Sequence, residues 1–437
     1  MQAIVNIMSP SIICMALAAP FAAMSKKRVW WFCTYWIIFF LAQLLMYYPG
    51  SDVSPYAYSN ANLEAIRFGG FTLSALSSIV ITEYIILCLM VAHKIKGKDT
   101  AAFLLALIPN CFSLVLTDSV STGVSSFLKM MLPFIISVFI GKTIHAGNVN
   151  MYRKTILATN IIIVGQVFLS KLIYGSFGAY NYYYELQDEF FGFYNHPHSF
   201  TSLLSVLVFF NIYEINKKRL IGLNLVLCGC SMIFMYMTGV RTYMVSLAAG
   251  LAWVGIAALH HSKMRRLRKY VYVVLICCLI VGPTLIQNLG SGRDYISADF
   301  SSGRFVRWIS DAAYVVSQFS PAEKLFGRGV NAVYAINERI FGVSINSLNL
   351  FIDLLCDYGF VGGIMMLAAY WKIFQNNWSQ GTKGFVGGFI VSFIVSAIIN
   401  SPVSYVPTMS AMVAVLILMK TEEHTEAETL AKRIGNG

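Results

Sequence analysis

The stretch KKRVWWFCTYWIIFFLAQLLMYY, residues 26–48, shows the pattern that decides the fold. Three basic residues precede twenty residues without a charge, which is the length that a helix needs to cross a bilayer. Short charged clusters cut the rest of the 437-residue chain into apolar runs of roughly 17 to 25 residues. With 57% hydrophobic and 12% charged residues, the composition is that of an integral membrane protein.

We predict an all-α integral membrane protein of about 13 transmembrane helices, within a range of 12–14. The first run precedes its basic residues, which indicates a retained helix with an outer N-terminus rather than a cleaved signal peptide. We expect a single polytopic membrane domain over residues 1–419 and a charged cytoplasmic tail at 420–437 that frays. The predicted helices cover residues 4–24, 29–48, 65–92, 101–116, 126–144, 155–174, 198–214, 220–237, 242–260, 270–287, 346–371, 384–400 and 403–419.

The positive-inside rule orients these helices when Lys26-Lys27-Arg28 is placed in the cytoplasm. The cytoplasmic segments then hold 22 of the 32 Lys and Arg residues, and 15 of those 22 are Lys. The outer segments hold ten, of which seven are Arg. Because an orientation bias depletes both residue types, this excess of Arg indicates an anionic ligand, with chance in a small sample as the alternative. The seven are Arg67, Arg241, Arg293, Arg304, Arg307, Arg328 and Arg339.

Two predicted outer loops are long. The loop at about 175–198 is rich in Tyr and Phe, which favours an aromatic belt at the membrane interface over a stacking surface for sugar rings. The loop at about 288–343 is long, and connections of this length usually have a function or are disordered. Its apolar residues recur at helical spacing, so we predict one or two short surface helices, with Gly327 and Gly329 turning the chain after them.

The strongest candidates for binding an anion are arginines in these outer segments. Arg241 lies in a tight turn, residues 238–242, where it would hold a pyrophosphate or extend to lipid headgroups. Arg304 and Arg307 lie three residues apart and share one face of a helix, with Trp308 beside them. An amphipathic surface helix bound to anionic lipid is the alternative for this stretch, and both interpretations can hold together.

Candidate catalytic residues are fewer. Five of the seven histidines fall on the predicted cytoplasmic side, so a general base at the outer face would be His196 or His198, with a structural role equally favoured. Glu83, Asp353 and Asp357 lie within predicted helices, where an acid is costly and often functional. We expect no metal site, since the two histidines lack a third ligand and the nine cysteines lie in apolar runs.

At these residues the chain resembles the superfamily of O-antigen ligases and Wzy-type polysaccharide polymerases. The resemblance covers residues 175–371, and each motif is weak by itself whereas the ordered set is moderately specific. The motifs are Asn195-His196-Pro197-His198, the turn from Thr238 to Arg241, Ser302-Gly303-Arg304 with Trp308, Phe326 to Gly329, and Ser347 to Gly362.

The resemblance implies action on undecaprenyl-diphosphate-linked glycans at the outer face of the bacterial cytoplasmic membrane. By position, the diphosphate role falls on Arg241 and Arg304, with Arg328 a weaker addition. The histidine slot of the ligases holds Leu348, so a histidine mechanism does not carry over, although the neighbouring Asn349 is retained and is a catalytic candidate. His196, His198 or Asp353 would have to replace that histidine, or no side chain deprotonates the acceptor hydroxyl.

We therefore expect a metal-independent and cofactor-independent glycosyltransferase that polymerises lipid-linked repeat units into capsule, O-antigen or exopolysaccharide. A glycan ligase of the same superfamily is the nearest alternative, and a flippase or other transporter is the alternative from a different class. Membrane lipid is an expected contact, and a flippase and a chain-length regulator are candidate protein partners. No nucleic-acid partner is expected, because orientation signals account for most of the net charge of +12.

Overall fold

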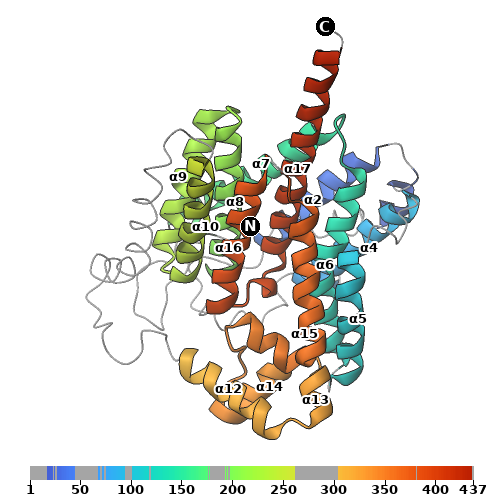
Figure 1. Ribbon diagram of the computed structural model, residues 1–437, viewed down its shortest axis with the longest axis vertical. Helices are drawn as coiled ribbons and strands as arrows, with labels where there is room; N and C mark the ends of the chain where they lie inside the picture. The colour runs from blue at the N-terminus through green and yellow to red at the C-terminus, as the bar shows by residue number, and fades with distance from the viewer. Residues whose placement is uncertain are drawn as a thin grey trace. The chain divides into compact units, whose positions relative to one another are not determined.

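The protein is almost entirely helical (Figure 1). The computed structural model describes residues 17–22, 24, 27–44, 67–68, 71–72, 75–93, 101–117, 120–175, 177, 192, 194, 197–260, 304–379 and 381–435. Within them, the only strands are β1 (Arg67–Phe68) and β2 (Phe71–Thr72), which form one antiparallel pair. The predicted all-α fold class is therefore confirmed for the described residues, while the predicted helix at 270–287 and most of the one at 4–24 lie outside them.

Apolar runs between charged clusters form the helices, as the sequence predicts, but several boundaries differ. The helices predicted at 126–144 and 155–174 begin at residues 120 and 149. The helix predicted at 65–92 begins at residue 75, and the last helix continues far beyond residue 419. The helices are α2 (Arg28–Leu44), α4 (Ala75–Ala92), α5 (Ala101–Leu116), α6 (Val120–Thr143), α7 (Val149–Tyr174), α8 (Pro197–Asn216), α9 (Ile221–Met237), α10 (Arg241–His260), α12 (Arg304–Gln318), α13 (Pro321–Phe326), α14 (Ala332–Phe341), α15 (Leu350–Asn376), α16 (Lys383–Ile399), η2 (Pro402–Ser404) and α17 (Val406–Gly435).

Several of these helices are suited to a bilayer. Among the described residues, five segments are long and apolar enough to cross a membrane, and further helices of 10–17 residues are apolar but shorter. The chain is therefore a membrane-embedded helical protein, and the number of 13 spans remains a prediction. The five segments are Ser126–Thr143, Val149–Leu172, Pro197–Asn216, Arg241–Ala258 and Leu350–Asn376.

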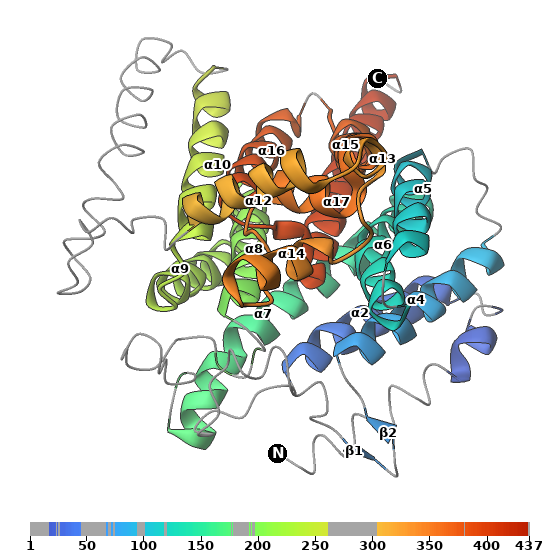
Figure 2. The same ribbon diagram turned by 90° about the horizontal axis from the view of Figure 1, so that it is seen from below.

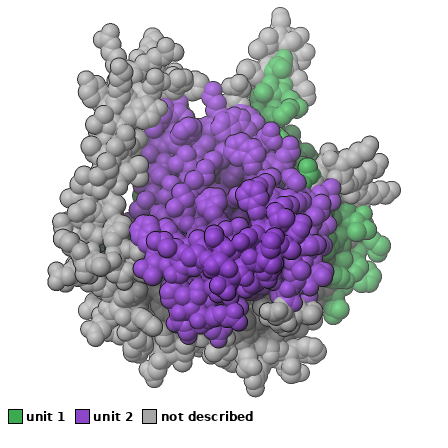
Figure 3. Space-filling model, turned by 60° about the horizontal axis from the view of Figure 1, so that its bottom comes forward, with its two compact units in different colours: residues 1–103, 128–243, 404–437 green, residues 104–127, 244–403 purple. Residues whose placement is uncertain are grey.

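The chain forms two compact units (Figure 3). Unit 1 comprises residues 1–103, 128–243 and 404–437, and unit 2 comprises residues 104–127 and 244–403. In unit 1, α8 packs against α9 and α17 and is buried along most of its length. Hydroxyl pairs join these helices, Thr201 to Thr238 at 2.9 Å and Ser202 to Thr408 at 2.6 Å. Such bonds help apolar helices to associate where water supplies no driving force.

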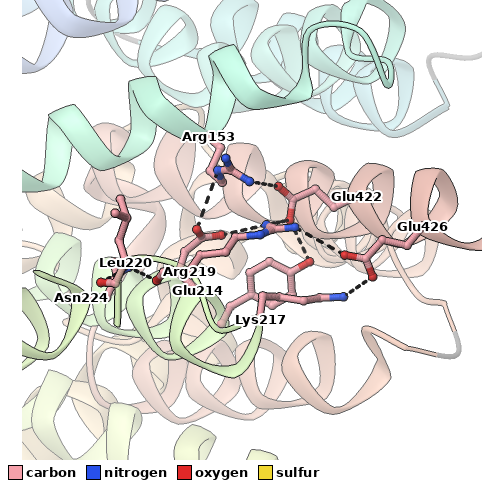
Figure 4. Close-up of polar contacts among 9 residues, drawn as sticks. Arg153, Glu214, Lys217, Arg219, Leu220, Asn224, Glu422 and Glu426 are labelled. Atoms are coloured by element: carbon pink, nitrogen blue, oxygen red, sulfur yellow. Dashed lines mark hydrogen bonds and ion pairs between the residues drawn. The ribbon is translucent and has the colours of Figure 1, made fainter. Parts of the chain in front are cut away.

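A network of ion pairs holds the C-terminal helix of unit 1 (Figure 4). Arg219, which follows α8, reaches Glu422 of α17 at 2.5 Å and Glu214 of α8 at 3.3 Å. Lys217 pairs with Glu426 at 2.5 Å, and Arg153 of α7 lies 3.6 Å from Glu422. The prediction that the tail frays is wrong for the described residues, because the tail continues α17 to Gly435 and these pairs hold its first part, as far as Glu426.

Candidate functional site in unit 2

The segment predicted as a long outer loop forms three short helices, α12, α13 and α14, one more than the highest number predicted. All three contact α15. The sequence of α13 defines its ends: Ser320 and Glu323 form a capping box, Pro321 occupies the first turn, and Gly327 follows the last residue. Most of the predicted site residues of unit 2 lie in these helices or at the start of α15.

A backbone joint fixes the turn after α13 to the middle of α15. Gly327 and Gly329 have φ of 78° and 97°, and the amide of Gly329 donates to the Asp357 carbonyl at 3.1 Å. Gly359 interrupts α15 with φ 65°, and a Cβ there would lie 2.4 Å from the Gly327 nitrogen. The glycines of the two motifs, 326–329 and 357–362, thus let two backbones touch.

Asp357 stabilises the helix that follows this joint. Its carboxylate accepts hydrogen bonds from the amides of Asn331 at 3.1 Å and Val333 at 3.2 Å, at the start of α14. These amides have no partner within their own helix, and a carboxylate at a helix N-terminus is favoured by the helix dipole. The structure therefore accounts for the buried Asp357 by a capping role.

Asp353 and Asn349 organise the start of α15. The Oδ1 atom of Asp353 accepts from the Ser347 amide at 3.1 Å and from the Ser347 hydroxyl in a short hydrogen bond. Asn349 caps α15 by accepting from the amides of Phe351 and Ile352, and it donates to the Ile398 carbonyl at 2.9 Å. Both predicted catalytic residues thus belong to one hydrogen-bonded corner between α15 and the end of α16.

The first turns of α12 contact this same corner. Arg304 Nη1 donates to the Ile399 carbonyl at 3.1 Å, at the C-terminus of α16. Arg307 Nη1 donates to the Asn346 carbonyl at 3.3 Å, and Trp308 Nε1 donates to the Ser347 carbonyl at 2.8 Å. The structure therefore brings Arg304, Arg307, Asn349 and Asp353 together.

A second carboxylate, Asp311, completes the cluster and was not singled out from the sequence. Asp311 is fully buried, and its Oδ2 atom accepts from Asn337 Nδ2 at 3.4 Å. Burial, with the charge of Asp353 adding to it, raises the pKa of Asp311 to about 6, although the Asn337 hydrogen bond and Arg307 act in the other direction. Its position four residues after Arg307 is the only signal that the sequence offered.

Arg307 lies near two acids, Asp311 and Asp353, but forms a close ion pair with neither of them. Burial lowers its pKa, and the charges of Asp311 and Asp353 offset this in part. Among the described residues, neither carboxylate comes within 4.0 Å of the Arg307 guanidinium, and its hydrogen bond to Asn346 is a single long one. Most of its N–H donors are thus left for a ligand or water. We call Arg304, Arg307, Asp311, Asn349 and Asp353 the α12–α15 cluster.

Arg328, a weaker candidate, is bound within α12 and α13. Its Nε donates to Glu323 at 2.8 Å, its Nη2 donates to the Gln318 carbonyl at 3.0 Å, and its guanidinium stacks 4.2 Å from the centre of the Phe319 ring. The hydrogen bond from Arg328 lowers the pKa of Glu323 to about 2. These contacts stabilise the helices and leave Arg328 fewer free donors than Arg307.

The remaining predicted residues belong to unit 1 or are not described. Arg241 is the first residue of α10 and is partly buried, after a turn in which Gly239 has φ 68°. His198 is the second residue of α8 and is also partly buried, whereas His196 lies outside the described residues. Within the described ranges, no group of three or more His, Cys, Asp or Glu side chains could hold a metal ion.

No family model, no curated protein and no solved structure matches this chain. The function must therefore be argued from the chain's own residues. The α12–α15 cluster provides the strongest basis, because it joins predicted site residues from segments 40 to 50 positions apart in one contact region.

Proposed function

We propose that this protein is a metal-independent glycosyltransferase that polymerises polyprenyl-diphosphate-linked oligosaccharide units at the outer face of a bacterial cytoplasmic membrane. The observation that carries the proposal is Arg307, a partly buried guanidinium with unused donors beside a second arginine. Partly dry guanidinium groups bind phosphates bidentately and more strongly than they do in water. A lipid diphosphate is the anion that suits a site at the end of membrane helices.

The chemistry requires little besides charge and position. An acceptor hydroxyl oxygen forms a bond to the anomeric carbon, the bond from that carbon to the diphosphate oxygen breaks, and the electron pair leaves with the diphosphate. Arg304 and Arg307 would stabilise the charge that develops on this leaving group. Asp353 is our candidate for receiving the hydroxyl proton.

The test uses cells in which this chain is the sole polymerase for a glycan of measurable length. Arg307→Ala and Arg304→Ala should abolish long chains and lead to accumulation of single lipid-linked units, at a normal protein level. Arg307→Lys should also fail, because an ammonium lacks the planar fork of donors. Arg339→Ala is the matched control, since Arg339 is an exposed arginine of α14 that donates to Tyr314.

The product distinguishes polymerase from ligase. Loss of a polymerase leaves single units on the lipid, whereas loss of a ligase leaves long chains on the lipid without a final acceptor. Normal chain length in both Arg307→Ala and Arg304→Ala would remove the proposed diphosphate role.

One observation favours transport as a second candidate function. Glu83 lies in α4, is only 3% exposed, and its Oε1 atom has no hydrogen-bond partner among the described residues. A buried acid within an apolar helix is typical of proton-coupled or ion-coupled transport. Glu83→Gln should then abolish movement of lipid-linked units across vesicle membranes, while a polymerase would keep its activity in detergent.

A further inference from the structure

The apolar face of helix α12 is exposed, whereas a surface helix of a water-soluble protein buries its apolar face. Its outward face carries Phe305, Ile309 and Val316, which are 55%, 70% and 70% exposed, together with the exposed Val306 and Ala313. Its inward face carries the fully buried Asp311 and the partly buried Arg304, and beside them Val315, which packs in a small apolar cluster with Val333 and Ile336. A surface helix in water buries its apolar stripe and exposes its charges. An apolar face exposed to this extent is suited to an apolar medium.

The contacts of α12 place it at the ends of apolar helices. Arg304 is bonded to the Ile399 carbonyl at the C-terminus of α16, and Trp308 is bonded to the Ser347 carbonyl just before α15 begins. Figures 1 and 2 show α12 lying crosswise to α15 rather than parallel to it. A helix that crosses spanning helices at their ends lies at the depth of the lipid headgroups when those helices span the bilayer.

The apolar surface continues from α16 toward α12. Ile394 and Ile398, in the last two turns of α16, are 46% and 44% exposed, and the carbonyl that binds Arg304 is that of the next residue, Ile399. Exposed apolar side chains at the end of an apolar helix are those that contact acyl chains. The surface that α12 adds thus extends a surface that already suits lipid.

We propose that α12 is an interfacial helix whose outward face, Phe305, Val306, Ile309, Ala313 and Val316, contacts the acyl chains of the bilayer. The occupant of this face is bulk phospholipid rather than a protein. Immersion of this face sets the depth of the helix, so that Arg304 and Arg307 lie at the level of the headgroup phosphates. The proposal does not depend on the enzymatic function, since a transporter would need the same surface.

Photocrosslinking tests this surface directly. The photoreactive amino acid p-benzoylphenylalanine is placed separately at positions 305, 309 and 316, and at the exposed Lys324 of α13 as the control. The purified full chain is reconstituted into vesicles of phosphatidylethanolamine and phosphatidylglycerol, irradiated, and analysed by mass spectrometry. The host side chains are exposed, so the variants should fold, and an unchanged gel-filtration profile verifies this before irradiation.

The expected result is an adduct of phospholipid mass at positions 305, 309 and 316, at least tenfold more abundant than at position 324. A crosslink to a second copy of the chain at these positions would overturn the proposal, because the face would then be a protein interface. Absence of any adduct above the control would also overturn it, since the face would be in water.

Discussion

The ion-pair network of unit 1 allows the clearest quantitative prediction. Arg219 contacts Glu214 and Glu422, two carboxylates on side chains that are only 4% and 3% exposed. Arg153 is the other cation near them, at 3.8 Å from Glu214 and 3.6 Å from Glu422. Arg219→Gln would leave two buried acids to share Arg153. Breaking a buried pair in this way costs about 3–5 kcal/mol, because it leaves an uncompensated charge.

A neighbouring pair in the same network provides the matched control. Lys217 and Glu426 are equally close, at 2.5 Å, but their side chains are 25% and 50% exposed. An exposed pair contributes only about 0.2–1 kcal/mol. Lys217→Gln should therefore lower the free energy of unfolding by about 1 kcal/mol at most. Both substitutions remove one contact of 2.5 Å, but Arg219→Gln also removes the contacts of Arg219 with Glu214 at 3.3 Å and with Glu426 at 3.4 Å. The contrast therefore reflects the burial of the acids together with the number of ion pairs that are lost.

The assay is the free energy of unfolding of the purified protein in mixed detergent micelles, with helix content as the signal. Adding Glu422→Gln to Arg219→Gln should recover about 1–3 kcal/mol, because it removes one of the two unpaired acids. Equal losses below about 1 kcal/mol for Arg219→Gln and Lys217→Gln would refute the reasoning. So would a double variant less stable than Arg219→Gln alone.

Two further predictions concern unit 2. Gly327→Ala should destabilise the protein by at least twice as much as Gly342→Ala in the same unfolding assay. Both positions have positive φ, which costs about 1–2 kcal/mol for alanine, but only at Gly327 would the new Cβ lie 2.3 Å from the Asp357 backbone oxygen. Similar losses in the two variants would show that the backbone joint adjusts easily to the added Cβ. The folded protein holds the Asp311 proton up to a pH of about 6, whereas the unfolded chain releases it near pH 4, so the parent should lose stability as the pH rises between these values. Asp311→Asn should remove this loss and stabilise the protein at pH 7. Unfolding measured across this pH range checks it, and a variant with the same pH slope as the parent would contradict the assignment of Asp311.

The sequence predicted the helices well because their ends depend on local features. Charged clusters interrupt apolar runs, so the bounds of α5, α8 and α9 lie within two residues of those predicted. The tail was mispredicted because its stability comes from Arg219 and Arg153, more than 200 residues away. No local pattern reports a partner at that separation.

The candidate site was predicted in part, because only some of its residues are linked by local spacing. The pairing of Arg304 with Arg307 follows from their spacing on one helix, and both contact the corner that contains Asn349 and Asp353. The burial of Asp311 was missed because the apolar spacing of α12 indicates a face but not which face is buried. In water the apolar face would be buried, and here it is the exposed one.

The inverted face of α12 also explains why arginine rather than lysine suits the α12–α15 cluster. A side chain on the inward face must satisfy backbone carbonyls at the ends of α15 and α16, as Arg307 does with Asn346. Guanidinium has five donors in a rigid plane, so one can serve a carbonyl while the others face a ligand. The three donors of an ammonium would be more fully used by the protein and its hydration. Under the proposed function, arginines at such positions would serve both the fold and an anion, which would explain their excess among the predicted outer residues.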